Sequence, residues 1–139
     1  MDNSVIKIMN FNLWSNELFI EERLSNLIGL VYYHNCDVLC FQELTPFVFN
    51  KLIHKLGLKY PYIVSSPELE TDTDYGIAIF SKHSIIKYNS VKLVNSIKDN
   101  YLLVSKIKKG NVEFNISTVQ LDNFNITTKC KQHEQVLKN

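Results

Sequence analysis

The sequence contains little arginine, glycine, proline or cysteine. Its 139 residues include four glycines and three prolines, and of its 15 basic residues only Arg23 is an arginine. Arginine is the side chain that holds phosphate or carboxylate groups through two parallel hydrogen bonds. A single arginine therefore argues against a binding site built from several such clamps.

Cysteine is scarce as well, and its spacing carries no motif. The three cysteines, Cys36, Cys40 and Cys130, are odd in number and match neither a disulfide framework nor a zinc-binding pattern. We therefore expect buried or idle thiols and no metal bound by thiolate.

Long apolar runs are absent too. No stretch approaches the roughly 20 apolar residues that a membrane-spanning helix needs. The N-terminal residues, MDNSVIKIMN, lack the apolar run and the small-residue cleavage site of a secretory signal. We expect no membrane span and a cytoplasmic or nuclear location.

What the chain does contain is typical of one globular domain. Hydrophobic residues make up 45% and charged residues 21% of the chain, and the formal net charge is +1. A net charge so close to zero gives no global attraction to nucleic acid or to a membrane. The length suffices for one hydrophobic core, so we expect a single domain over residues 1–139.

The first half of the sequence alternates strand and helix patterns. β-branched and apolar residues predict strands at 5–12 and 38–42. Apolar residues at helical spacing predict a helix at 17–34, with acidic residues in its first turns. Thr45 followed by a proline is typical of a helix N-terminus, and this second helix is predicted to end at Gly57.

The second half reads mainly as strands joined by turns. The acidic segment 67–74 is predicted to be an exposed loop, and turns are predicted at 96–100 and 110–111. Strands are predicted at 60–66, 75–82, 84–94, 101–110 and 111–121. A last helix is predicted at 128–139. Two βα steps followed by a β-meander predict an α/β fold, with a mixed β-sheet and helices on one face.

The segment VLCFQEL, residues 38–44, places a carboxylate directly after a buried strand. Glu43 follows this strand together with Gln42, and Asn12 ends the strand before it. If the two strands are parallel neighbours, their carboxyl ends lie on one rim of the sheet, where α/β proteins place their sites. One carboxylate with amides and water suits magnesium. The alternative is that Gln42 and Glu43 form a helix-capping or surface feature.

Four segments in order resemble a known family. They are IKIMNFNLW, DVLCFQELTP, YGIAIFSK and NISTVQLDN. Together they resemble the endonuclease/exonuclease/phosphatase superfamily, which has the deoxyribonuclease I-like fold, and they look most like its tyrosyl-DNA phosphodiesterase 2-like branch. The resemblance implies a four-layer α/β/β/α sandwich. It covers only the N-terminal half of such a domain, so residues 1–139 would form a truncated domain.

The resemblance also implies a set of catalytic residues. Asn12 matches the family asparagine at the metal and phosphate site. Glu43 matches the glutamate that binds magnesium, with manganese as a second option, and Gln42 is the residue that usually precedes and supports it. Gln120 stands where the family has a histidine, so this catalytic position departs from the pattern.

Other positions are implied to lie around the catalytic set. Trp14 and Tyr75 match positions beside the substrate cleft of the family. Gln132 stands where a family arginine often begins an R-x-x-Q helix pattern. Each of these assignments depends on the resemblance alone.

Two family motifs are missing. The family's second half supplies a GDFN-type Asp/Asn pair and an SDH-type Asp/His pair, and nothing after Asn125 resembles either. These groups orient the attacking water and bind the phosphate, so hydrolysis without them lacks most of its machinery. We also expect the chain to supply about one sheet, whose inner face, with Val112, Phe114 and Ile116, needs a partner.

Three hypotheses are open at this point. In the first, the chain is the N-terminal part of a magnesium-dependent phosphodiesterase, inactive or incomplete alone. Its partners would be DNA or another phosphodiester substrate, and a second chain that completes the sandwich. In the second, it is a degenerate, non-catalytic remnant that acts as a binding module, which the glutamine at position 120 favours. In the third, it is an independent α/β domain of another kind.

Overall fold

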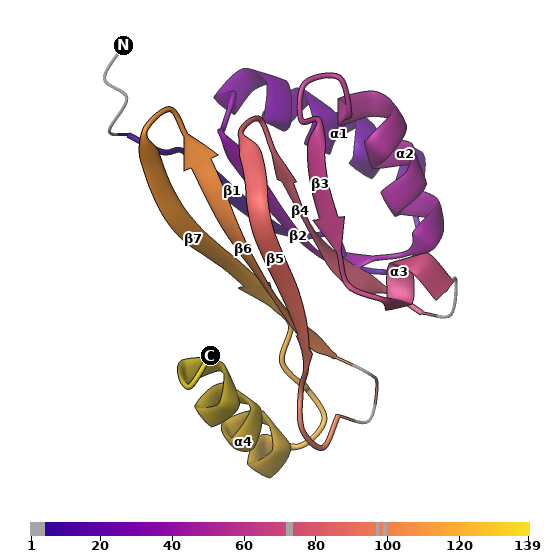
Figure 1. The fold of residues 1–139 in the computed structure, drawn as a ribbon. Coiled ribbons are helices and arrows are strands. Elements are labelled where there is room, and N and C mark those ends of the chain that lie inside the picture. The colour runs from indigo at the N-terminus through magenta and orange to yellow at the C-terminus, as the bar shows by residue number, and fades with distance from the viewer. Residues whose placement is uncertain (1–4, 72–73, 97, 99) are drawn as a thin grey trace.

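Two β-sheets stack on one another, and helices cover the outer face of one of them (Figure 1). The computed structural model describes residues 5–71, 74–96, 98 and 100–139. Its strands are β1 (Ile8–Asn12), β2 (Val38–Leu44), β3 (Tyr62–Ser65), β4 (Gly76–Ser81), β5 (Ser84–Lys92), β6 (Tyr101–Lys109) and β7 (Val112–Val119). Its helices are α1 (Ile20–His34), α2 (Pro46–Leu56), α3 (Glu68–Thr71) and α4 (Ile126–Leu137).

The two sheets differ in topology. The first sheet has the order β1-β2-β4-β3, in which β1 and β2 are parallel and the other pairs antiparallel. The second sheet has the order β5-β6-β7 and is antiparallel throughout. The predicted α/β fold with a mixed sheet and helices on one face is confirmed. The prediction that the chain supplies about one sheet is wrong, because the last three strands form a second one.

The second sheet exists because both faces of β4 need cover. All six residues of this strand are buried. Ala78 and Phe80 point into the core under the helices. Ile77 and Ile79 point the other way and pack against Leu103 of β6, in a core between the two sheets. The chain therefore turns after β4 and lays its next three strands over the inner face.

The alternating face of β7 meets the first sheet. Phe114 and Ile116 pack against the core between the two sheets, and Thr118 is buried. The predicted need of this face for a partner is thus met within the chain for these residues. Val112, at the start of the strand, remains 44% exposed.

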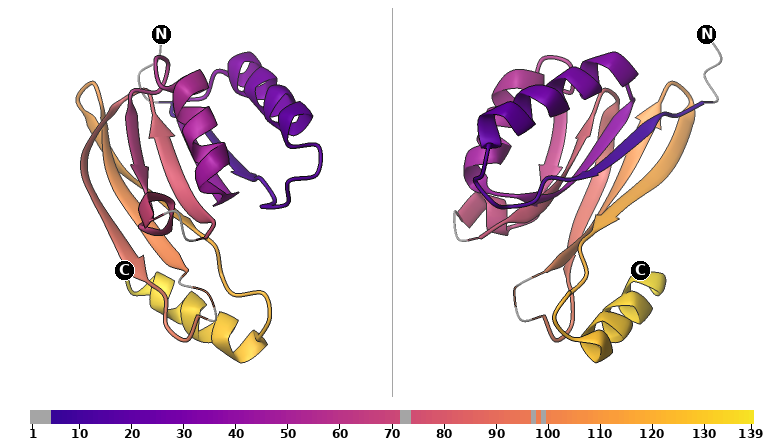
Figure 2. Two further views of the ribbon diagram at one scale, coloured as in Figure 1. Left: turned by 90° about the vertical axis from the view of Figure 1, so that its right-hand side faces the viewer. Right: turned by 180° about the vertical axis from the view of Figure 1, so that it is seen from behind.

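Helices α1 and α2 lie on the same side of the first sheet (Figure 2). Leu24 and Leu27 of α1 join Leu52 and Leu56 of α2 in the outer core, where Phe80 of β4 meets them. The predicted start of α2 is confirmed: Thr45 caps it by accepting a 3.3 Å hydrogen bond from the Val48 amide, and Pro46 follows. Within the described residues, no helix combines the length and apolar character needed to cross a membrane.

The segment 67–74 was predicted to be an exposed loop, and this is wrong for its first part. Residues 68–71 form the short helix α3, and Leu69, only 6% exposed, packs into the outer core. The prediction rested on the acidic residues of the segment and did not account for its single leucine. Residues 72–73 lie outside the described residues, as do 97 and 99 of the predicted turn at 96–100.

Helix α4 lies beyond one end of the sandwich, apart from the other helices (Figure 2). Gln132 is fully buried at its contact with the rest of the chain. Its Oε1 accepts a 2.7 Å hydrogen bond from the Asp122 amide, and its Nε2 donates to the Val94 carbonyl at 3.1 Å. Gln135, one turn later, accepts a 2.8 Å hydrogen bond from the Val94 amide. Gln132, which stands at the family arginine position, therefore holds α4 against the rest of the chain.

Candidate functional site

The carboxyl ends of β1 and β2 lie side by side. In their parallel register Asn12 is the partner of Gln42, and the next residue is Glu43. Asn12 Nδ2 donates a 3.1 Å hydrogen bond to Glu43 Oε1. The structure thus brings together, on one rim of the first sheet, the two residues to which the sequence assigned a metal.

Glu43 adopts an unusual backbone conformation. Its φ is +55°, in the left-handed region that side chains other than glycine seldom adopt, and the pairing of β2 with β4 shifts register between Phe41 and Leu44. Such a residue costs of order 1–3 kcal/mol, and such bulges often re-aim a side chain near a site. Here Gln42 is buried while Glu43 is partly exposed.

Neutral donors surround the Glu43 carboxylate. Oε1 accepts hydrogen bonds from Asn12 and from Gln120 Nε2, the latter at 2.8 Å, and Oε2 accepts one from the Ser15 amide at 3.0 Å. Burial alone would raise the pKa of this carboxyl, but the three donors and the charge of Lys98 outweigh it and hold the pKa below its usual value. Glu43 is therefore ionised at neutral pH.

Gln42 connects three strands behind the site. Its Nε2 donates to Asn10 Oδ1 of β1 and to Thr118 Oγ1 of β7, both at 2.7 Å. Thr118 is buried in the second sheet. Gln42 therefore joins the two sheets just beneath Glu43, which is a positioning contact rather than a contact with a ligand.

Gln120 approaches the site from the end of β7. While its Nε2 contacts Glu43, its Oε1 is buried, and no donor among the described residues reaches this atom. Carboxylate and amide oxygens are the ligands that magnesium prefers. The donor set therefore fits a hydrated magnesium ion. The described residues contain no group of three or more His, Cys, Asp or Glu side chains suited to a metal, so any such ion would keep several waters.

The only arginine holds the loop beside the site. Arg23 of α1 donates hydrogen bonds to the carbonyls of Leu13, Trp14, Asn16 and Leu18. This loop explains why α1 begins at residue 20 rather than at 17 as predicted. From the sequence, Arg23 was considered only as a phosphate-binding residue. Its role in holding the 13–18 loop was missed, because no local pattern in the sequence indicates it.

Trp14 lines one hollow together with Glu43, and Tyr75 lines another together with Gln120. Trp14 is 52% exposed, and the Arg23 guanidinium lies 5.0 Å from the centroid of its ring. The backbone amide of Trp14 donates a 2.9 Å hydrogen bond to Asn12 Oδ1. Tyr75 lines a small hollow with Gln120, and the Lys98 ammonium lies 4.3 Å from its ring centroid. Lys98 is a charged neighbour of Glu43 that sequence reasoning missed, because nothing in the predicted turn distinguishes it.

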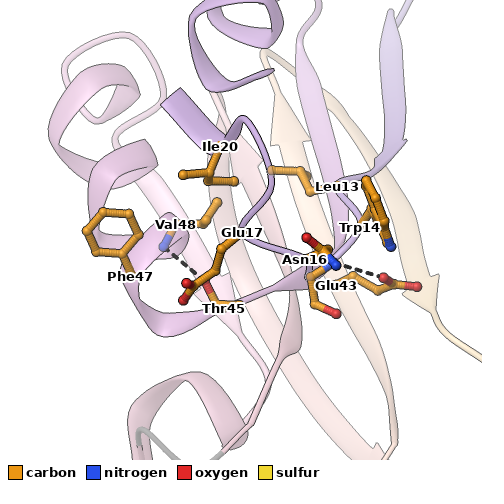
Figure 3. Close-up of a pocket in the computed structure, with 10 residues that line it drawn as sticks. Leu13, Trp14, Asn16, Glu17, Ile20, Glu43, Thr45, Phe47 and Val48 are labelled. Atoms are coloured by element: carbon orange, nitrogen blue, oxygen red, sulfur yellow. Dashed lines mark hydrogen bonds between the residues drawn. The ribbon is translucent and has the colours of Figure 1, made fainter. Parts of the chain in front are cut away.

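A larger hollow opens on the Trp14 side. This cavity of about 370 Å³ lies between the 13–20 segment and the start of α2, with Glu43 at its edge (Figure 3). Leu13, Ile20 and Val48 supply apolar walls. The rim of the sheet thus presents an ionised carboxylate beside a cavity large enough for a small molecule.

The chain matches one family model and several solved structures. The model of the Endonuclease/Exonuclease/phosphatase family matches residues 9–128. The structure of TDP2 from D. rerio, complexed with a single-strand DNA product, superposes with a TM-score of 0.85 at 18% identity, over 96% of this chain and 53% of that one. TDP2 from C. elegans gives a TM-score of 0.84 at 20% identity, over 96% and 41%.

A solved relative of another activity has the same fold. The mannosyl-6-phosphatase Bt3783 of Bacteroides thetaiotaomicron superposes with a TM-score of 0.80 at 14% identity, over 96% of this chain and 58% of that one. No curated protein sequence matches the chain. The chain therefore spans between about two fifths and three fifths of the length of these solved relatives.

Proposed function

Because the chain belongs to the Endonuclease/Exonuclease/phosphatase family, we propose that it is the N-terminal part of a magnesium-dependent phosphodiesterase. The observation that carries the proposal is Glu43, an ionised carboxylate that shares a rim of the sheet with Asn12 and whose hydrogen-bond donors among the described residues are all neutral. A cation bound there would pair with a charge that no cation hydrogen-bonds among the described residues.

The side chains at this rim would have different roles in binding the metal and the phosphate. Glu43 would bind the metal. The Gln120 amide, which turns its Nε2 toward the carboxylate, would have to turn its Oε1 there instead to act as a second oxygen ligand. Asn12 would orient the carboxylate through its Nδ2. A magnesium ion held here would supply positive charge to a phosphate oxygen. Lys98, beside Tyr75, would add a second positive charge near Glu43.

We propose further that this chain alone is inactive or incomplete. Among the described residues, the rim offers the single carboxylate of Glu43, and groups that act together in catalysis lose most of their effect when part of the set is removed. The solved relatives extend well beyond the matched region. A second polypeptide that completes the sandwich is therefore one proposed partner. DNA is the other, since one relative was crystallised with a DNA product.

A cytoplasmic or nuclear location remains part of the proposal. All three cysteines are free, and Cys130 is exposed. Free thiols, one of them on the surface, suit a reducing compartment.

One observation favours the alternative, a non-catalytic binding module. Glu43 Oε1 already accepts two hydrogen bonds, one of them from Gln120 at the family histidine position. An amide that satisfies the carboxylate competes with a metal for the same lone pairs. The two candidates differ in whether magnesium displaces these donors.

Thermal unfolding with and without magnesium tests the metal. We expect millimolar Mg²⁺ to stabilise the wild-type chain by about 1 kcal/mol, or roughly 2–4 °C in Tm, because a ligand that binds only the folded state stabilises it. Glu43→Gln should lose this shift, whereas Glu22→Gln, an exposed carboxylate of α1, should keep it. Equal shifts for all three proteins would refute metal binding at Glu43.

An activity assay tests the proposed incompleteness of this chain. With an aryl phosphodiester and a 5′-phosphotyrosyl oligonucleotide as substrates, we expect no magnesium-dependent turnover by this chain above background. Turnover that Glu43→Gln abolishes would contradict the proposed incompleteness and establish a complete enzyme.

A further inference from the structure

The cavity beside Glu43 has a composition that differs from that of a phosphate site. Its volume of about 370 Å³ lies within the range of small-molecule pockets, roughly 300–1,000 Å³. Leu13 and Val48, 6% and 4% exposed, form an apolar floor together with Ile20. No lysine, arginine or histidine is among the described residues that line it. An anionic group would therefore find no charged partner inside.

The lining carries negative charge instead. Among the described residues of the lining, the titratable ones are Glu17 and Glu43. In Figure 3 the Glu17 side chain extends across the cavity toward Thr45 and Phe47. No side chain among the described residues forms an ion pair or hydrogen bond with the Glu17 carboxylate. This charge is therefore available to a ligand.

Two exposed aromatic rings flank the cavity. Phe47 and Trp14 are 55% and 52% exposed and stand at opposite sides of it (Figure 3). The face of an aromatic ring attracts cations, and each of these rings already has a basic group over it, Lys51 at 4.8 Å and Arg23 at 5.0 Å.

Neither basic group cancels the charge of the lining. Lys51 is ion-paired with Glu21 on α1. Lys98, the charged neighbour of Glu43, is ion-paired with Asp74. Arg23 keeps its positive charge, because its hydrogen bonds go to neutral carbonyls of the 13–18 loop. The two carboxylates of Glu17 and Glu43 outnumber this one cation, so the cavity keeps a net negative character.

We propose that this cavity binds an organic ammonium with a small apolar body. The ammonium group lies between the Glu17 carboxylate and the exposed ring of Phe47, and the body rests on the apolar floor formed by Leu13, Ile20 and Val48. A carboxylate beside aromatic rings supplies the attraction that such cations need. The site goes beyond the proposed phosphodiesterase function and requires no metal.

Trp14 provides the measurement, because it is the only tryptophan in the chain and lines the cavity. The full chain is titrated in EDTA with phenethylammonium, with the neutral isostere 2-phenylethanol and with the anion phenylacetate, and tryptophan fluorescence is recorded. Ligand-observed NMR with the same three compounds gives a second measurement that does not depend on Trp14. We expect the cation to bind on the order of 5-fold more tightly than the alcohol, and the anion to bind least.

Two matched variants assign the preference to Glu17. Glu17→Gln should remove most of the preference for the cation over the alcohol, because only the Glu43 carboxylate then remains in the lining, while Glu22→Gln should leave the preference unchanged. The proposal is overturned if the cation shows no binding by either method, if the three compounds bind alike, or if the two variants behave alike. Because EDTA removes magnesium, none of these outcomes depends on a metal at Glu43.

Discussion

At the scale of single residues, Glu43 combines a strained backbone with a satisfied side chain. Its φ of +55° is unfavourable, yet its carboxylate accepts hydrogen bonds from Asn12, Ser15 and Gln120. Hydrogen bonds to a charged group contribute roughly 1.5–3 kcal/mol each, which is enough to offset the strain. The three donors come from β1, from the loop that follows it and from the end of β7. The conformation of one residue therefore depends on both sheets.

The pKa of Glu43 should report the loss of one donor. Asn12→Ala removes the hydrogen bond from Nδ2, the first of the contributions that lower this pKa. We expect the pKa to rise toward its usual value, measured by NMR titration of the carboxyl carbon. Since the folded-state pKa is lowered, this carboxylate stabilises the fold above its unfolded-state pKa and loses that effect as pH falls through the folded-state value.

The same titration of Asn16→Ala is the control, because the Asn16 side chain contacts the Leu18 amide and not Glu43. A Glu43 pKa that stays unchanged in Asn12→Ala would show that the contact between the two side chains is not maintained in solution.

At the scale of elements, the four consecutive residues 43–46 present the carboxylate, end a strand and begin a helix. Leu44 is the last residue of β2, Thr45 caps α2, and Pro46 occupies its first turn. The cap uses an amide that has no partner inside the helix. Because Glu43 lies two residues before this cap, the start of α2 restricts the direction in which the carboxylate can point.

Removal of the cap should weaken α2. Thr45→Ala leaves the Val48 amide without its 3.3 Å partner and should cost about 1 kcal/mol, measured by urea unfolding. Thr127→Ala in the first turn of α4 is the comparison, because Asn125 caps that helix and Thr127 is exposed. The comparison should be nearly neutral, and equal losses for the two variants would contradict a capping role for Thr45.

At the scale of the whole molecule, Asp37 ties the two sheets together at the end opposite to Glu43. Its Oδ1 lies 2.7 Å from His83 Nε2 in the turn between β4 and β5. Its Oδ2 accepts from the Lys7 amide at 2.9 Å and from Lys109 Nζ of β6 at 3.3 Å. Burial alone would raise the pKa of Asp37, but these donors outweigh it and lower the pKa.

The Asp37 network should make stability depend on pH. Asp37→Asn keeps the shape and removes the charge, so we expect a loss of roughly 1–3 kcal/mol at neutral pH by urea unfolding. The folded-state pKa of Asp37 is below its ordinary 3.8, so its contribution is present above that value and disappears as pH falls through the folded-state pKa. The difference in free energy of unfolding between Asp37→Asn and wild type should therefore disappear at acidic pH.

Glu113→Gln is the matched control for this prediction. Glu113 pairs with Lys106 within the second sheet, with both side chains about two fifths exposed, and exposed pairs contribute little. A gap between Asp37→Asn and wild type that stays constant with pH would argue that the Asp37 charge does not hold the sheets.

Local patterns in the sequence by themselves determined the first strands and helices and the proximity of Asn12 to Glu43. The period of apolar residues defines β1, α1, β2 and α2 to within a few residues, because each pattern reflects which face is buried. Parallel pairing of two neighbouring strands then follows from the helix between them, and it brings Asn12 close to Glu43.

Only the tertiary structure decided the rest, since it depends on contacts between residues far apart in the chain. The second sheet arises because the inner face of β4 needs cover, which no pattern within β5, β6 or β7 reveals. Gln120 reaches Glu43 across 77 residues of sequence, and Gln42 reaches Thr118 across 76. Likewise the cavity beside Trp14 exists only where the 13–20 segment faces the start of α2. Such distances in sequence carry no local signal, because their stabilisation appears only once the two sheets have packed.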